Sequence, residues 1–109
     1  MNKKNIVIIG AGNAGETLAY EILTSDDSNE YNILCFLDDD ENKKEINIDN
    51  HNIKVEGKVK DIEKIINKYK KDNIEIEEII IAIPTLKQKE LLEILDIIYP
   101  TGIKYKILP

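Results

Sequence analysis

A chain of 109 residues, 42% hydrophobic and 33% charged, has room for one domain over residues 1–109 but not for a nucleotide domain plus a substrate domain. The net charge of −6 argues against a nucleic-acid backbone or an anionic membrane as a direct partner. No apolar run approaches the roughly 20 residues that cross a bilayer. The first residues lack the features of a signal peptide. The single cysteine can form no internal disulfide, so a reducing, cytoplasmic location is expected.

The elements follow from hydrophobic patterning, which alternates between short apolar runs and helical spacing. Five strands and three helices, linked by right-handed crossovers, predict a Rossmann-like, doubly wound α/β fold. We expect a mostly parallel five-stranded sheet with helices on both faces. In chain order the predicted elements are a strand at 5–9, a helix at 13–24, a polar loop at 25–30, a strand at 32–37, a polar surface excursion at 41–52, a strand at 53–56, a helix at 59–70, a strand at 76–83, a helix at 86–99 and a strand at 103–108.

A glycine-rich turn joins the first predicted strand to the first helix, and it reads Gly10, Ala11, Gly12, Asn13, Ala14, Gly15. A GxGxxG pattern in this context indicates a site for a phosphate-bearing ligand. The first glycine allows the tight turn, the second lets phosphate approach the backbone, and the third lets the helix pack close to the sheet. The alternative is that the glycines serve only tight packing.

Asp38 follows the second predicted strand, where an acidic residue of a dinucleotide-binding fold hydrogen-bonds the ribose hydroxyls. A carboxylate there repels a 2′-phosphate, and all fifteen basic residues of the chain are lysines, so no arginine can accept one. This favours NAD or a nucleoside diphosphate over NADP. The alternative is that Asp38, Asp39 and Asp40 only end a strand with solvated charge.

A ligand in an open parallel sheet lies at the carboxyl ends of the strands where the strand order reverses. Here that crevice is predicted between the first strand and the strand at 76–83. Ala82, Pro84 and Thr85 are expected to line it, although Thr85 is equally suited to capping the next helix. Lys58, at the start of another helix, is a weaker candidate for an anion contact.

The helix at 86–99 carries apolar residues over more than half of its circumference, which exceeds the stripe of about 100° that one sheet face requires. The surplus, chiefly Ile94 and Ile97, is expected either to meet another helix of the same fold or to form an interface. We therefore expect a homodimer through this helix or a docking surface for another domain. The apolar residues are Leu91, Leu92, Ile94, Leu95, Ile97, Ile98 and Tyr99.

No catalytic or metal-binding constellation emerges from the sequence. The single histidine, His51, is expected to be exposed, and the single cysteine, Cys35, is expected to be a buried, inert thiol. One histidine and one cysteine cannot build a transition-metal site. No tyrosine is followed by a lysine four residues later, as short-chain dehydrogenases require for proton transfer. The chain alone is therefore expected to bind rather than to catalyse.

Five segments occur in an order that resembles one family. The chain looks like the N-terminal, "CoA-binding"-type Rossmann domain of CapD-like, membrane-anchored nucleoside-diphosphate-sugar epimerases and dehydratases of polysaccharide biosynthesis. The resemblance runs from about Lys3 to Pro109, and its end is the most specific part. The segments are IVIIGAGNAGETLA, ILCFLDDD, KVEGKVKDI, EEIIIAIP and LLEILDIIYPTGIKYKILP.

The resemblance implies a module excised between membrane helices and a catalytic Rossmann domain, both of which this chain lacks, at the cytosolic face of the inner membrane. It assigns ligand binding to Gly10, Gly12, Gly15 and Asp38 and gives no catalytic residue. NAD is the first choice of cofactor, and a UDP-sugar or CoA is the second. The rival hypotheses are a sensing or oligomerisation module of a polyprenyl glycosylphosphotransferase or an amino-sugar acyltransferase, and, less favoured, a free-standing dehydrogenase.

Overall fold

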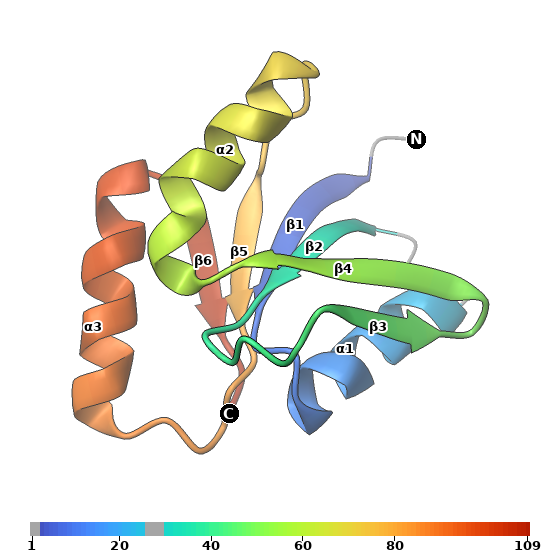
Figure 1. The fold of residues 1–109 in the computed structure, drawn as a ribbon, viewed down its shortest axis with the longest axis horizontal. Helices are drawn as coiled ribbons and strands as arrows, with labels where there is room; N and C mark the ends of the chain where they lie inside the picture. The colour runs from blue at the N-terminus through green and yellow to red at the C-terminus, as the bar shows by residue number, and fades with distance from the viewer. Residues whose placement is uncertain (1–2, 26–29) are drawn as a thin grey trace.

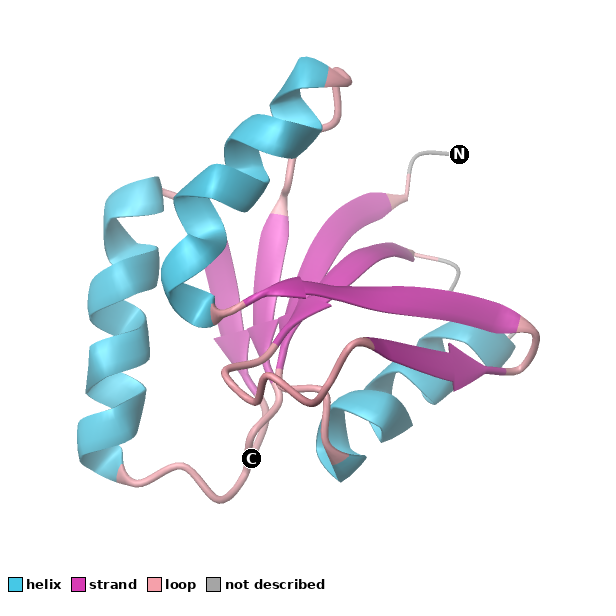
Figure 2. Ribbon diagram, viewed as in Figure 1, coloured by secondary structure: helices cyan, strands magenta, loops and turns pink. Residues whose placement is uncertain are grey.

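The computed structural model describes residues 3–25 and 30–109 and contains a single six-stranded sheet flanked by helices (Figures 1 and 2). The predicted polar loop at 25–30 falls mostly outside the described residues. The elements are β1 (Lys4–Ile9), α1 (Asn13–Thr24), β2 (Tyr31–Leu37), β3 (Glu45–Ile48), β4 (His51–Gly57), η1 (Val59–Asp61), α2 (Ile62–Lys71), β5 (Glu78–Ile81), α3 (Gln88–Ile98), η2 (Tyr99–Thr101) and β6 (Lys104–Ile107).

The strand order is β3-β4-β2-β1-β5-β6. All neighbours pair in parallel except β3 and β4, which are antiparallel. β1 lies between β2 and β5, so the chain order reverses on either side of β1, as the sequence predicted. The Rossmann-like doubly wound fold is therefore confirmed, and the carboxyl ends of β1, β2, β4 and β5 meet at one edge of the sheet (Figure 1).

The predicted number of five strands is wrong, because part of the predicted surface excursion at 41–52 forms β3 and the start of β4. Ile46 and Ile48 alternate with polar residues and are buried. Asp49 and Asn50 form the two-residue connection between the strands, at φ values of 46° and 69°. Two successive residues with positive φ match the hairpin turn that best suits the twist of antiparallel strands.

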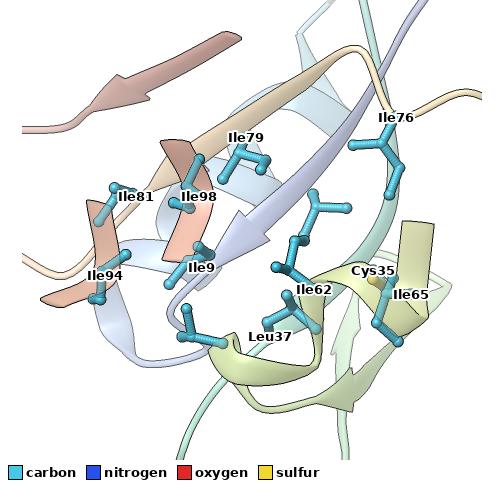
Figure 3. Packing of buried hydrophobic residues seen from close by; sticks show 12 residues of the cluster. Ile9, Cys35, Leu37, Ile62, Ile65, Ile76, Ile79, Ile81, Ile94 and Ile98 are labelled. Carbon is cyan, nitrogen blue, oxygen red and sulfur yellow. The ribbon is translucent and has the colours of Figure 1, made fainter. Parts of the chain in front are cut away.

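Each face of the sheet has its own apolar core. Residues of α1 and of the β3–β4 hairpin cover one face, where Ile8 and Phe36 are buried, while α2 and α3 cover the other. Figure 3 shows this second core, in which Ile9 and Ile81 of the sheet lie close to Ile94 and Ile98 of α3. Helices on both faces were expected, and this arrangement leaves the glycine turn at the junction of the two layers.

Most of the surplus apolar residues of α3 lie against the rest of the fold. Ile94 is buried with only 9% of its surface exposed, and Ile97 packs against the same core, so both meet neighbours within the fold. The exposed members are Leu92, at 52%, and Tyr99, at 80%. Ile94 and Ile97 are thus not free for an interface, and the homodimer remains a prediction.

One charged side chain is fully buried among the described residues. Glu78, at the amino end of β5, lies 3.8 Å from Lys4 Nζ and 3.6 Å from Lys106 Nζ, and its carboxylate oxygens accept no hydrogen bond. The two lysines come from the neighbouring strands β1 and β6. Because an isolated buried carboxylate is strongly unfavourable, these lysines supply the charge that permits its burial.

Candidate functional site: the glycine turn and the clefts beside it

The glycine turn continues directly from β1 and is held by backbone hydrogen bonds. Gly10 N–H donates to the Leu37 carbonyl at 2.8 Å, and Ala82 N–H donates to the Ile9 carbonyl at 2.8 Å. Gly10 has a φ of +109°, a conformation that favours glycine. A Cβ on Gly15 would lie 1.9 Å from the Gly10 carbonyl oxygen, so the third glycine lets α1 start directly against the turn.

Gly12 has a different environment from the other two glycines of the turn. It is the N-cap of α1 with a φ of −91°, and a Cβ placed on it would meet no atom within 4 Å. No side chain caps the helix here. The N–H groups of the first turn have no acceptor within the helix, and they carry the positive end of its dipole. The start of α1 therefore combines open space at Gly12 with backbone donors suited to an anion.

Asp38 is bound to the glycine turn. Its Oδ2 atom accepts a hydrogen bond from Ala11 N–H at 2.8 Å, and its Oδ1 atom accepts one from Asp40 N–H at 2.8 Å. Each carboxylate oxygen can accept a further bond. Asp38 thus fixes the turn against the end of β2 and can still receive hydroxyl donors from a ligand.

A cleft of about 570 Å³ lies at this edge of the sheet, between the ends of β1, β2, β4 and β5 and helix α3. We call it the acidic cleft. Its turn after β4 is fixed by hydrogen bonds from Val59 N–H to Asp39 Oδ1 at 3.0 Å and from Lys58 N–H to Asp61 Oδ2 at 2.9 Å. The lining residues are Ile9, Asp38, Asp39, Lys58, Val59, Lys60, Ile83, Leu86, Glu90, Glu93, Ile94 and Ile97.

A second hollow, of about 470 Å³, lies beside the first two turns of α1, and we call it the α1 groove. Its surface is mainly apolar, and it contains no histidine, cysteine or lysine. The lining residues are Asn13, Ala14, Thr17, Leu18, Glu21, Pro84 and Leu108. Asn13 and Ala14 belong to the glycine turn, so this groove adjoins the turn directly. The acidic cleft adjoins it through Ile9, which precedes the turn, and through Asp38, which is hydrogen-bonded to Ala11.

The structure brings most of the predicted site residues to this edge of the sheet. Asp38 lines the acidic cleft, while Pro84 lines the α1 groove. Ala82 is buried, and Thr85 is exposed and lines neither hollow. The weaker candidate Lys58 does line the acidic cleft. The sequence did not predict that Ile83, Leu86 and helix α3 would line the acidic cleft.

A second group of polar side chains lies away from the cleft, where α2 packs on β2 and β4. Burial, together with the charge of Glu56, raises the pKa of the Cys35 thiol to about 12. Burial also raises the pKa of Tyr69, whose single hydroxyl proton is shared between the Glu56 carboxylate and the Leu34 carbonyl. Lys68 pairs with the same Glu56 carboxylate, and this hydrogen bond raises its pKa. Cys35 is buried as predicted, and this group holds α2 on the sheet.

In the part of the chain that the structure describes, no three side chains form a metal-binding group. Among those same residues no helix has both the length and the apolar character needed to cross a membrane. His51 lies at the exposed start of β4 and lines neither hollow, as its polar surroundings predicted.

Solved structures of other proteins share this fold. UDP-D-quinovosamine 4-dehydrogenase from Vibrio fischeri aligns with a TM-score of 0.78 and 25% identity, over 99% of this chain and 80% of that chain. RSP in complex with β-NADH aligns with a TM-score of 0.72 and 24% identity, over 98% of this chain and 46% of that chain, which shows the fold alone.

The sequence also matches a curated protein and a defined family. The capsular polysaccharide biosynthesis protein CapD of Staphylococcus aureus is 38% identical over all 109 residues, and the chain spans 17% of its length. This similarity confirms the predicted resemblance to CapD-like proteins. The family described as "CoA-binding domain" matches residues 1–109, so the chain belongs to the CoA-binding domain family.

Proposed function

We propose that this chain is a single nucleotide-binding module that holds a diphosphate at the glycine turn. The observation that carries the proposal is the N-terminus of α1, which has no side-chain cap, is open at Gly12 and adjoins the α1 groove. Unpaired backbone N–H groups and the helix dipole favour a diphosphate at this position. Because the chain lacks arginine, these backbone groups are the main source of such binding.

NAD(H) is the first choice of ligand, and the residues at the site fit it. Its adenosine half would occupy the acidic cleft, with the ribose hydroxyls donating to Asp38 and the adenine against apolar side chains such as Val59 and Ile83. The second half of the ligand would extend along the α1 groove past Asn13 and Pro84. NAD(H) supplies hydride chemistry when bound.

A UDP-sugar is the second choice, since the diphosphate would bind in the same way. The fold-related dehydrogenase from Vibrio fischeri acts, by its name, on a UDP-sugar. The two ligands differ in the base and in what lies beyond the diphosphate, so a direct binding comparison separates them.

We propose further that the module serves a nucleoside-diphosphate-sugar epimerase or dehydratase of capsular or exopolysaccharide biosynthesis. The similarity to CapD over the whole of this chain supports this assignment. In such a protein the module would bind or regulate rather than catalyse, and its partner would be the catalytic domain of the same polypeptide. We place it in the cytoplasm, at the cytosolic face of the inner membrane.

The test is a thermal-shift and calorimetric screen of the purified chain against NAD(H), UDP, UDP-N-acetylglucosamine and CoA. A ligand at a hundred times its dissociation constant stabilises the fold by about 2.7 kcal/mol. The substitution Gly12→Glu should abolish the shift, because it places a carboxylate where the diphosphate would bind. It should leave the unliganded fold intact, because the position is open and its φ is ordinary.

Asn67→Glu is the matched control, since it adds the same charge at an exposed position on α2. This variant should bind like the unmodified chain. If no nucleotide raises the melting temperature of the unmodified chain, the proposed function is wrong. If Gly12→Glu binds as well as Asn67→Glu, the glycine turn is not the site.

A further inference from the structure

The name of the family implies CoA, whose adenosine ribose carries a 3′-phosphate that NAD(H) and UDP lack. We propose that the acidic cleft of this chain rejects any phosphate on the ribose, so that its ligand has an unmodified ribose and CoA is not bound. This inference rests on the proposed function, since it assumes that a nucleotide places its ribose at Asp38.

The charge lining the cleft opposes a ribose phosphate. Four acidic residues line the space, Asp38 and Asp39 directly after β2 and Glu90 and Glu93 on α3, against two lysines, Lys58 and Lys60. A ribose whose hydroxyls reach Asp38 places its 2′ and 3′ oxygens next to this carboxylate. A phosphate on either oxygen would bring about two more negative charges to the same place.

The two lysines are poorly placed to offset that repulsion. Lys58 Nζ already lies 3.7 Å from Glu41 Oε1, so part of its charge is engaged. Lys60 is exposed at the rim of the cleft, where solvent and salt screen its charge. No arginine occurs anywhere in the chain to bind a phosphate with two parallel hydrogen bonds.

Helix α3 adds to the selectivity from the opposite wall of the cleft. Glu90 is held in place by a hydrogen bond that its Oε1 atom accepts from Lys87 N–H at 2.9 Å. Glu93 lies one turn further along the same helix and also lines the cleft. These carboxylates are independent of Asp38, so the rejection of a ribose phosphate comes from two walls rather than from one residue.

Two pairs of ligands isolate the ribose phosphate. Dephospho-CoA and CoA differ only in the 3′-phosphate, and NADH and NADPH differ only in the 2′-phosphate. Calorimetry on the unmodified chain should show dephospho-CoA and NADH binding at least about tenfold more tightly than their phosphorylated counterparts. Raising the salt concentration should narrow both ratios, because the repulsion is screened.

Glu93→Lys and Asp96→Lys make the same change of charge on the same helix, but Asp96 does not line the cleft. Glu93→Lys should narrow each affinity ratio by about threefold or more, whereas Asp96→Lys should leave it unchanged. The inference would be overturned if the unmodified chain bound CoA at least as tightly as dephospho-CoA, or NADPH at least as tightly as NADH. If UDP binds but no member of either pair does, the inference fails and the proposed function stands. If no nucleotide binds, both fail.

Discussion

The same substitution, glycine to alanine, should strongly destabilise the fold at the third glycine of the turn and leave its stability nearly unchanged at the second. In Gly15→Ala the new Cβ would lie 1.9 Å from the Gly10 carbonyl oxygen, about 1.5 Å short of the 3.4 Å at which ordinary contact begins. The obstructing atom is backbone and cannot rotate away. Helix α1 must therefore move off the turn, which we expect to cost about 3 kcal/mol or more of the free energy of unfolding.

In Gly12→Ala the Cβ meets no atom within 4 Å and the φ of −91° suits any residue. Alanine reduces the entropy of the unfolded chain, which stabilises by about 0.4–1 kcal/mol, but it is a poorer N-cap than glycine by a similar amount. These two effects nearly cancel. We therefore expect the free energy of unfolding to change by no more than about 0.5 kcal/mol.

Urea unfolding followed by far-ultraviolet circular dichroism measures both values, and it suits a chain that has no tryptophan. For a domain of this size the loss in Gly15→Ala corresponds to a fall of about 12 °C or more in melting temperature. The reasoning is refuted if Gly15→Ala lies within about 1 kcal/mol of the unmodified chain. It is equally refuted if the two variants lose the same stability.

Asp38→Asn should lower the free energy of unfolding by about 1–2 kcal/mol, because an amide offers one oxygen where Ala11 N–H and Asp40 N–H now have two. Asp96→Asn on the exposed face of α3 is the control, and equal stability of the two variants in urea would contradict the role given to Asp38. Cys35 should not react with a thiol reagent at pH 8 in the folded chain and should react in urea, since burial raises its pKa to about 12. The unfolded thiol loses its proton near its ordinary value of 9.0, so this group makes stability fall as the pH rises from about 9 towards 12, and Cys35→Ala should show a smaller fall.

The parts of the fold that the sequence predicted best are those in which local signals agree. The apolar run of β1, the glycine turn and the helical spacing of α1 each indicate the same strand–turn–helix unit, and the structure contains it with nearly the predicted ends. The order of β1, β2 and β5 followed because parallel strands with helical crossovers allow few arrangements.

The hairpin of β3 and β4 was missed because its strands are short and rich in polar residues. The signal was present, since Ile46 and Ile48 alternate with polar residues and Asp49 and Asn50 form a two-residue turn. These two residues form a strand because they are buried in the apolar core on the α1 side of the sheet. This contact joins segments that are distant in the sequence, so local strand propensity does not predict it.

Two features of the structure depend on elements that are distant in the sequence. The burial of Glu78 requires Lys4 from β1 and Lys106 from β6, and no local pattern shows that both reach one carboxylate. The contribution of α3 to the acidic cleft likewise depends on how the helix packs. Periodicity identified an apolar surplus on α3 but not that Ile94 and Ile97 would turn towards the cleft.

Asp38 connects the stability of this fold to its proposed ligand. The carboxylate that would receive the ribose hydroxyls already holds the glycine turn through Ala11 N–H, so the turn that would bind the diphosphate is ordered before any ligand arrives. Preorganisation of this kind lowers the conformational cost of binding. A ligand hydroxyl can donate to Asp38 without displacing this bond, because each carboxylate oxygen has a second acceptor position. Loss of the carboxylate would therefore weaken binding twice, through the missing ribose contact and through a less ordered turn, whereas substitution at Gly12 removes binding from a turn that is still intact.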